Sequence, residues 1–170
     1  MKDFTDFRFC PRCANASIEV YLKNAIRCLS CGYIYFHNVA AAVAGIIEIE
    51  GKILLLRRAH EPKIGYLDLP GGFVDYRESL DQALAREVME ETGLAVADIR
   101  YFGSFANTYR YEEVTYFTAD AVFLCRPLDT GALKLSDETS EFCLVDPRTV
   151  EFEALAFESV KGSLARYAGS

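Results

Sequence analysis

Three glutamates lie within five consecutive positions of the stretch REVMEETG: Glu87, Glu90 and Glu91. If this stretch is helical, at about 100° per residue, the three carboxylates share one arc beside an apolar stripe. That stripe consists of Leu80, Leu84 and Val88. Like charges at this spacing each cost a helix roughly a few tenths of a kcal/mol, whereas clustered carboxylate oxygens are the ligands that Mg²⁺ and Mn²⁺ prefer. The stretch therefore predicts either a divalent-cation site or a solvated, charged helix face.

Residues around the glutamates would suit a cation site, although a solvated charged face is what a Glu-rich helix usually presents. Arg86 can hold a neighbouring glutamate through a charge-assisted hydrogen bond. Upstream, the stretch PGGFVD places a glycine turn before the helix, and glycine lets the backbone come close to a ligand or metal. With a metal bound, one carboxylate can orient or deprotonate a water while the cation neutralises phosphate charge. If the stretch is a cation site, the chemistry it predicts is displacement at a phosphate group.

A second candidate metal site is made of two C-x-x-C pairs separated by 14 residues: Cys10, Cys13, Cys28 and Cys31. Four thiolates at this spacing can close a tetrahedral shell around Zn²⁺. A unit of residues 1–36 has little core of its own, so the metal would supply its folding energy. The pattern predicts a structural zinc ribbon with no open position for catalysis. The remaining Cys125 and Cys143 lie in strand-like runs and are interpreted as buried thiols.

The rest of the chain, residues 37–170, predicts a mixture of strands and helices. Runs rich in β-branched, aliphatic and aromatic residues predict strands over 39–49, 52–58, 99–109, 114–125 and 141–146. Helices are predicted over 79–92, where Gly93 is a natural C-terminal stop, and over about 153–168. Because strands and helices do not alternate strictly, the predicted fold class is α+β, with helices on both sides of a mixed sheet.

Length and charge narrow the classes of function. The 170 residues suit one domain with a small appendage, and no apolar run is long enough to cross a bilayer. No signal peptide is visible in the first residues, so the expected location is the cytoplasm. The net charge of −7 and the pI near 4.9 disfavour general nucleic-acid binding, because Lys and Arg are not in surplus. An anionic substrate would have to be received through a local cation.

With these residues in view, the sequence strongly resembles the Nudix hydrolases. Their signature, G-x5-E-x7-R-E-U-x-E-E-x-G-U with U a bulky aliphatic residue, runs unbroken from Gly72 to Leu94. The flanking stretches GKILLLRR, LPGGFVD, ETSEFCLVDP and LAFESVKGSL are similar to other parts of the family, so the resemblance covers about residues 38–165. It implies a Nudix fold, an α/β/α sandwich. It also implies metal-dependent hydrolysis of the phosphoanhydride bond in a nucleoside diphosphate linked to another moiety, such as ADP-ribose, an NDP-sugar or a dinucleotide.

The resemblance implies roles for individual residues. A metal-binding group would hold Mg²⁺ or Mn²⁺: Glu87, Glu91, the nearby Glu90 and the carbonyl of Gly71. Arg86 and Glu78 would support the loop and orient Glu87. Family members often place the general base on a glutamate outside the signature. The candidates here are Glu138, which we favour, and Glu141, Glu112 and Glu113.

Four further side chains bear on substrate binding. Tyr109 and Tyr111 are candidates to stack on a base, although strand tyrosines more often pack in a core or at its rim. Arg57 and Arg58 end a predicted strand near the signature and are candidates to meet phosphate, with one of them expected to be solvated.

A zinc ribbon ahead of a Nudix domain resembles the NADH pyrophosphatases. Their further signature, S-Q-P-W-P-F-P-x-S, is missing from the corresponding stretch YFGSFANTYRYEE. This departure leaves the substrate open between NADH or NAD-capped RNA ends and other nucleotide-linked diphosphates. A non-catalytic Nudix-fold nucleotide sensor is the alternative of another class, and the complete set of signature glutamates disfavours it. A homodimer is an expectation by family analogy only.

Overall fold

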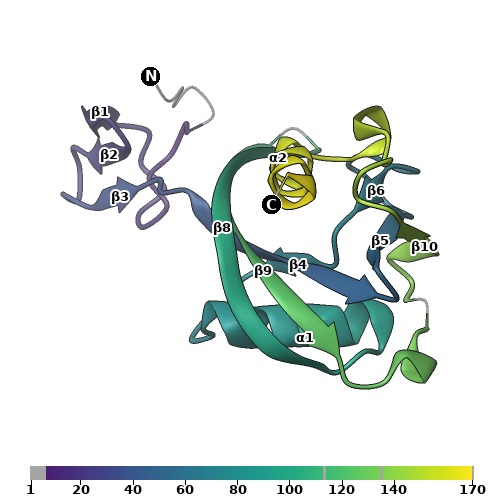
Figure 1. Ribbon diagram of the computed structural model, residues 1–170. Coiled ribbons are helices and arrows are strands. Elements are labelled where there is room, and N and C mark those ends of the chain that lie inside the picture. Colours follow the sequence, from purple (N-terminus) through teal and green to yellow (C-terminus); the bar gives the residue numbers. More distant parts are fainter. Residues whose placement is uncertain (1–6, 113, 135, 170) are drawn as a thin grey trace. The chain divides into compact units, whose positions relative to one another are not determined.

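The computed structural model describes residues 7–112, 114–134 and 136–169. The chain divides into two compact units, the first ending at Val39 and the second beginning at Ala40 (Figure 1). Among the described residues, no helix is both long and apolar enough to span a membrane.

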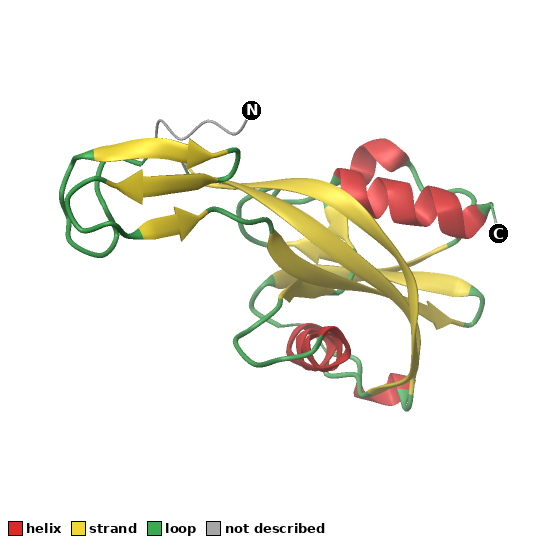
Figure 2. Ribbon diagram, turned by 90° about the vertical axis from the view of Figure 1, so that its left-hand side faces the viewer, coloured by secondary structure: helices red, strands yellow, loops and turns green. Residues whose placement is uncertain are grey.

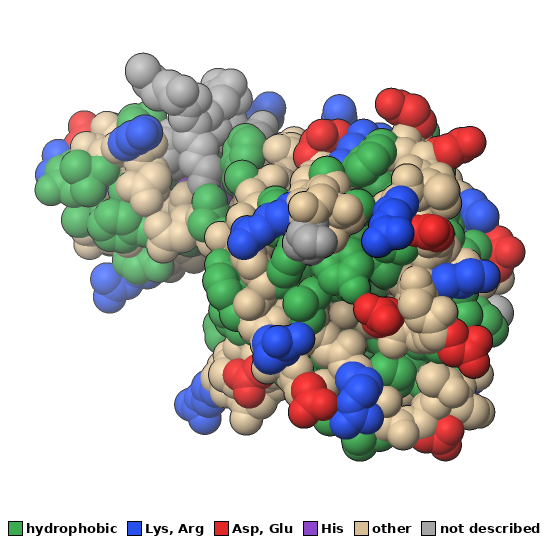
Figure 3. Space-filling view, in the orientation of Figure 1, with side chains coloured by type: hydrophobic (Ala, Val, Ile, Leu, Met, Phe, Trp, Pro, Cys, Tyr) green, Lys and Arg blue, Asp and Glu red, His purple; other side chains and the backbone are tan. Residues whose placement is uncertain are grey.

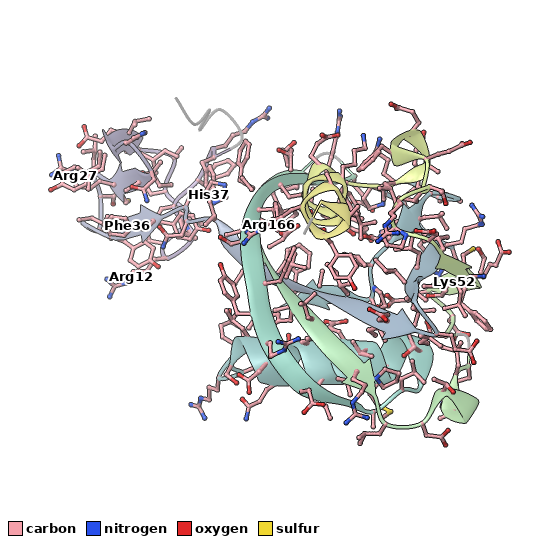
Figure 4. The ribbon with its side chains drawn as sticks, viewed as in Figure 1. Arg12, Arg27, Phe36, His37, Lys52 and Arg166 are labelled. Atoms are coloured by element: carbon pink, nitrogen blue, oxygen red, sulfur yellow. The ribbon has the colours of Figure 1, made fainter. Side chains whose placement is uncertain are left out.

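The first unit is built on a three-stranded antiparallel sheet in the order β1-β2-β3 (Figure 2). Its strands are β1 (Ile18–Leu22), β2 (Ala25–Cys28) and β3 (Ile34–Phe36). Strands β1 and β2 form an antiparallel hairpin in which Ile18 lies opposite Cys28. Figure 4 shows Arg27 and Phe36 on this sheet. Because only a few side chains of the unit are buried, its core is small.

The second unit is a mixed sheet with strand order β10-β5-β4-β9-β8, to which β6 and β7 add as short pairings. The strands are β4 (Ala40–Ile49), β5 (Lys52–Arg58), β6 (Leu67–Asp68), β7 (Gly71–Phe73), β8 (Val96–Tyr111), β9 (Val114–Pro127) and β10 (Thr139–Val145). The β4–β9 pair is parallel and the other pairings are antiparallel. This mixture confirms the predicted fold class.

Two helices cover opposite faces of the sheet, α1 (Leu80–Thr92) on one and α2 (Glu158–Ala168) on the other (Figure 1). Successive strand residues point to opposite faces, so Leu54 and Leu56 of β5 pack with α1, while Ile53 and Leu55 pack with α2. Arg166 of α2 lies against β8 (Figure 4), with its guanidinium 4.8 Å from the ring centre of Phe102. The second unit is therefore the predicted α/β/α sandwich.

Local sequence signals set the limits of α1. Ser79 and Gln82 form a capping box at its start, and Gly93 ends it in the left-handed conformation with φ of 72°. A residue other than glycine is disfavoured at such a φ. Leu84 and Val88 are fully buried as predicted, but Leu80 is 40% exposed. The prediction for Leu80 was wrong because the buried stripe continues from Val88 towards the C-terminal end, at Thr92, and not into the first turn.

The second predicted helix was wrong at its start. Residues Phe152–Ala154 form a separate 3-10 turn, and α2 begins only at Glu158. Between them the backbone is extended, because Leu155 forms a parallel bridge with Leu67 and the N–H of Ala156 donates to the carbonyl of Leu67 at 2.8 Å. A pairing with a distant strand thus replaces the first turns of the expected helix.

The sheet opens between the neighbouring strands β4 and β5. β4 and β5 pair only at their hairpin end, where Glu48 faces Ile53 and Ile49 faces Lys52. Beyond this point β4 pairs with β7, and β5 pairs with β6. The segment between β6 and β7 closes on β4 through a hydrogen bond of 2.8 Å from the N–H of Gly45 to the carbonyl of Pro70. The opening gives side chains from both helical layers access to one cleft.

Candidate active site and cysteine cluster

A cleft of about 350 Å³ lies at this opening. Glu87, Glu90 and Glu91 of α1 line it together with Gly71 and Gly72 of β7. Its other walls come from strands β4, β5, β6, β8 and β9, from Glu138 just before β10, and from the start of α2. The structure therefore brings the three helix glutamates and the glycine turn to one place.

The two glycines are required by close approaches on either side of the backbone. A Cβ on Gly71, whose φ is 151°, would lie 2.1 Å from the carbonyl oxygen of Val43 on β4. A Cβ on Gly72 would lie 2.7 Å from the carboxylate carbon of Glu87. The N–H of Gly71 donates to Oε2 of Glu91 at 2.8 Å. The glycine turn thus fits tightly between β4 and the glutamates of α1.

Arg86 is the centre of a hydrogen-bond network that fixes the site. Its guanidinium donates to both oxygens of Glu78, at 2.9 Å each, and to the carbonyl of Phe73 at 3.1 Å. Nη1 donates to Glu87 at 2.8 Å and to Glu90 at 3.1 Å. Hydrogen bonding to Arg86 lowers the pKa of Glu78. The arginine therefore ties the loop before the helix to the carboxylates on it.

The cleft holds more negative than positive charge. The pKa of Glu91 is raised to about 8, mainly by burial and also by the charges of Asp68, Glu87 and Glu138, against a lowering by the N–H of Gly71. Burial also raises the pKa of Glu87, against a lowering by Arg86. No Lys or Arg nitrogen in the described part of the chain lies within 4.0 Å of Glu91. A largely buried carboxylate such as Glu91, crowded by other acids and without a Lys or Arg partner among the described residues, fits the requirements of a divalent cation.

The carboxylate oxygens of the cleft do not yet converge as a coordination shell. Over the described ranges, only the four cysteines bring three or more candidate ligand atoms within 4.8 Å of one another. Glu87 is turned towards Arg86, and Glu91 towards the N–H of Gly71. Binding of a cation would therefore require these side chains to turn towards each other.

Of the three described candidates for a base outside the signature, only Glu138 lines the cleft. Glu138 is exposed on the segment before β10, lines the cleft and raises the pKa of both Glu87 and Glu91 by its charge. Glu141 instead pairs with Arg57 at 2.7 Å. Glu112 lies in the turn between β8 and β9, outside the cleft lining. Glu113 lies outside the described residues.

Two acidic strand residues that the sequence analysis did not single out also line the cleft, as does the exposed Asp75 after β7. Asp68 of β6 accepts from Nη1 of Arg58 at 3.0 Å, and burial raises its pKa to about 6 despite this partner. Asp120 of β9 is 8% exposed. Asp68 and Asp120 each stand alone in an apolar run of the sequence. An acidic residue within a run that is expected to be buried was the only signal that could have indicated a functional role.

Of the four residues proposed for substrate contact, Tyr109 and Arg58 line the cleft. Tyr109 lies in the cleft and packs against Phe73 and Phe157, with ring centres 5.5 Å apart in each pair. Arg58 also lines the cleft, but it is held by Asp68 and by the carbonyl of Pro62. Tyr111 is 50% exposed at the end of β8 and lines a smaller hollow beside the cleft.

The four cysteines of the first unit lie together as predicted. The Sγ atoms of Cys10 and Cys31 are 3.7 Å apart, as are those of Cys13 and Cys28. A tetrahedral zinc with Zn–S bonds of about 2.3 Å has sulfurs about 3.8 Å apart. The backbone N–H groups of Cys31 and Ser30 lower the pKa of the Cys28 thiol to about 7, whereas, against a lowering by the backbone of Asn15, the neighbouring thiols and burial raise that of Cys13 to about 12. The spacing and chemistry are compatible with a zinc ribbon.

The two remaining cysteines differ from each other. Cys125 is buried as predicted, and burial raises its pKa to about 12. Cys143 is only half-buried, because it lies on the outer strand β10, where it approaches Nη2 of Arg57 at 4.0 Å. The prediction that both thiols are buried was therefore wrong for Cys143.

A mixed sheet between two helices, with an acidic helix and a glycine turn meeting in a cleft, is the architecture of a Nudix fold. The sequence profile of the NUDIX domain matches residues 36–166. The chain belongs to the NUDIX family, and the resemblance of its signature is confirmed.

Relatives and solved structures agree with this assignment. The chain is 31% identical over 159 residues to the NAD-capped RNA hydrolase NudC of Vibrio cholerae, covering 94% of this chain and 55% of that protein. It is 32% identical over 142 residues to NudC of Mannheimia succiniciproducens, covering 79% and 50%. The chain thus spans about half the length of these curated relatives. A NUDIX hydrolase from Nitrosomonas europaea superposes with a TM-score of 0.78 at 26% identity, covering 96% of this chain and 91% of that one.

Proposed function

We propose that this protein is a divalent-metal-dependent pyrophosphohydrolase that cleaves the diphosphate of a nucleoside diphosphate linked to a second moiety. The observation that carries the proposal is the crowding of Glu87 and Glu91 in a cleft where Glu91 has no cationic partner among the described residues. Membership of the NUDIX family supports the same reaction class.

Different residues would bind the metal, position Glu87 and supply the general base. Glu87, Glu90, Glu91 and the carbonyl of Gly71 would hold Mg²⁺ or Mn²⁺. When bound, the metal neutralises charge on the phosphate oxygens. Arg86 keeps Glu87 in place and is itself held by both oxygens of Glu78. Glu138, which is exposed in the cleft, acts as the general base that takes a proton from the attacking water.

The names of the relatives suggest NAD-containing substrates. The similar proteins from Vibrio and Mannheimia are named as NAD-capped RNA hydrolases, so NAD, NADH and NAD-capped RNA ends are the first compounds to test. The chain lacks the S-Q-P-W-P-F-P-x-S motif, and strand β8 places Asn107 and Tyr109 in the cleft from the corresponding stretch. ADP-ribose and NDP-sugars therefore belong in the same panel.

Under this proposal, nucleic acid binds only as the RNA that follows such a capped end. On the face of the second unit shown in Figure 3, acidic and basic side chains are interspersed and no broad basic patch is visible. The net charge of −7 is consistent with a small nucleotide as the main ligand.

The test is release of monophosphate from this panel by the purified protein, with and without Mg²⁺ or Mn²⁺. We expect metal-dependent turnover of at least one compound, and loss of turnover by at least about 100-fold in Glu87→Gln. Glu153→Gln, an exposed glutamate of the 3-10 turn, is the matched control and should keep full activity. Tight nucleotide binding without turnover of any compound would instead identify a non-catalytic sensor.

For the first unit we propose a structural role based on one bound Zn²⁺. The four-cysteine cluster offers a closed tetrahedral shell, and the sheet beside it has few buried side chains to stabilise it otherwise.

A further inference from the structure

The cleft has a second half, away from the helix glutamates, whose composition is different. It lies on the face of the sheet that α2 covers, and side chains of β8 and β9 form its wall: Asn107, Tyr109, Thr118 and Asp120. The proposed hydrolysis gives none of these residues a role.

Asp120 is the unusual member of this wall. It is 8% exposed, and its oxygens accept hydrogen bonds from the hydroxyl of Thr118 and from Nδ2 of Asn107, the latter at 3.0 Å. Within the described ranges no Lys or Arg nitrogen lies within 4.0 Å of it. A buried carboxylate with only neutral donors is costly unless it gains another partner. Each oxygen keeps a lone pair for such a partner.

Asn107 adds an acceptor beside Asp120. Because its Nδ2 donates to Asp120, its Oδ1 is turned away from the carboxylate. No described group donates to this oxygen, and the residue lines the cleft. Together the two side chains present acceptors that suit a ligand with an NH₂ group.

The rest of this half is shaped for a flat ring. Ala42 and Ala44 of β4 line it with methyl groups only, and Ala42 pairs with Asp120 on one side and Phe73 on the other. The rings of Phe73, Tyr109 and Phe157 border the space, and Tyr109 packs against both of the others. Aromatic side chains are the usual stacking partners of nucleobases.

We propose that this half of the cleft is a specificity subsite for a planar heterocycle that carries an NH₂ donor, which Asp120 and Asn107 accept. The proposal rests on the proposed function, because the ring belongs to a nucleotide whose phosphates face the glutamates. Two groups of a dinucleotide share this chemistry, the exocyclic amine of adenine and the carboxamide of nicotinamide.

Binding of mononucleotides tests the subsite independently of turnover. Titration calorimetry with Mg²⁺ would compare AMP with IMP, and nicotinamide mononucleotide with nicotinic acid mononucleotide. We expect the NH₂-bearing member of one pair to bind at least about 10-fold more tightly, because its partner leaves Asp120 facing an oxygen. Preference in the first pair places adenine in the subsite, and preference in the second places nicotinamide there.

Asp120→Asn supplies the specific test. It keeps an acceptor for Thr118 but offers an NH₂ donor, so the preference should fall to within about threefold or reverse in favour of the oxygen-bearing analogue. Asp98→Asn, at an exposed carboxylate paired with Arg126, is the matched control and should leave the ratio unchanged. If Asp120→Asn does not fold, Thr118→Val, which removes a hydrogen bond that orients Asp120, should reduce the same ratio.

The outcomes separate this proposal from the proposed function. Equal binding within both wild-type pairs, or an unchanged preference in Asp120→Asn, would overturn the subsite. Glu87→Gln should lose turnover while it keeps the base preference. If no compound of the panel is hydrolysed but the preference is present, the subsite stands and the proposed hydrolysis fails.

Discussion

Gly72 and Glu87 are packed so closely that a single added methyl group would have to displace the carboxylate. The Cβ of an alanine at position 72 would lie 2.7 Å from Cδ and Oε1 of Glu87 and 2.8 Å from Oε2. The glycine that opens the family signature therefore leaves the space that the central glutamate occupies.

Gly72→Ala is expected to lower kcat by about 100-fold, because even a displacement of about 1 Å at a reacting centre can cost that much. Stability should change by roughly 1 kcal/mol or less, since the added methyl meets a movable side chain. Steady-state kinetics and thermal melting would check both statements. Gly131→Ala, in the exposed 3-10 turn, is the matched control. Full activity in Gly72→Ala would contradict the role given to Glu87.

Glu138→Gln separates the candidates for the general base. We expect kcat to fall by about 100- to 10,000-fold with little change in KM, because glutamine fills the same space but cannot accept a proton. Glu141→Gln is the natural comparison, since Glu141 pairs with Arg57 outside the cleft, and it should stay within about twofold of wild type. Equal losses in the two variants would mean that the segment before β10 acts through its structure and not through a base.

Stability without a divalent cation in the cleft should fall as pH rises. Burial raises the pKa of Glu91 from 4.5 to about 8 and that of Asp68 from 3.8 to about 6. The folded protein therefore holds these protons more tightly than the unfolded chain, and the resulting stability, complete below about pH 4, is lost as pH rises to about 8. For Glu91 the loss is on the order of 5 kcal/mol, at 1.36 kcal/mol per pKa unit.

Melting temperatures of the zinc-loaded, magnesium-free protein between about pH 5 and 8.5 would measure this loss. Added Mg²⁺ should offset it increasingly towards the upper end, because a cation replaces the lost protons. In Glu91→Gln both the pH dependence and the effect of Mg²⁺ should shrink. A melting temperature that rises over this range would show that the carboxylates are not as buried as described.

Cys28→Ser should remove the metal of the first unit. The wild-type protein, purified without added metal, is expected to contain one Zn²⁺ per chain, and the variant less than about a tenth of that. Elemental analysis gives the content, and limited proteolysis should show cleavage within residues 7–39 of the variant only. Cys143→Ser, at a thiol away from the cluster, should retain the zinc. Iron, or no metal, in the wild type would overturn the assignment.

The features that the sequence predicted are those set by local chemistry. Helix α1 has its capping residues, its periodic apolar side chains and its terminal glycine within one short stretch, so its limits were predicted almost to the residue. The hairpin of β4 and β5 was equally clear from two apolar runs around Glu50 and Gly51. The cysteine cluster followed from spacing alone.

The features that the sequence missed depend on distant pairings. The start of α2 was misplaced because Ala156 donates to Leu67, a partner far away along the chain. Asp120 enters the cleft because β9 runs parallel to β4, where it faces Ala42, and nothing near Asp120 in the sequence indicates this register. Asp68 depends in the same way on the pairing of β6 with β5.

Because β4 exchanges β5 for β7 part of the way along its length, the cleft is reached from both helical layers. Glutamates on α1 line the end of the cleft for which hydrolysis is proposed, while the wall of Asn107, Thr118 and Asp120 lies on the other face of the sheet, beneath α2. Under the proposed function, we therefore expect mutations in that wall to change which nucleotide binds and to leave bond cleavage intact.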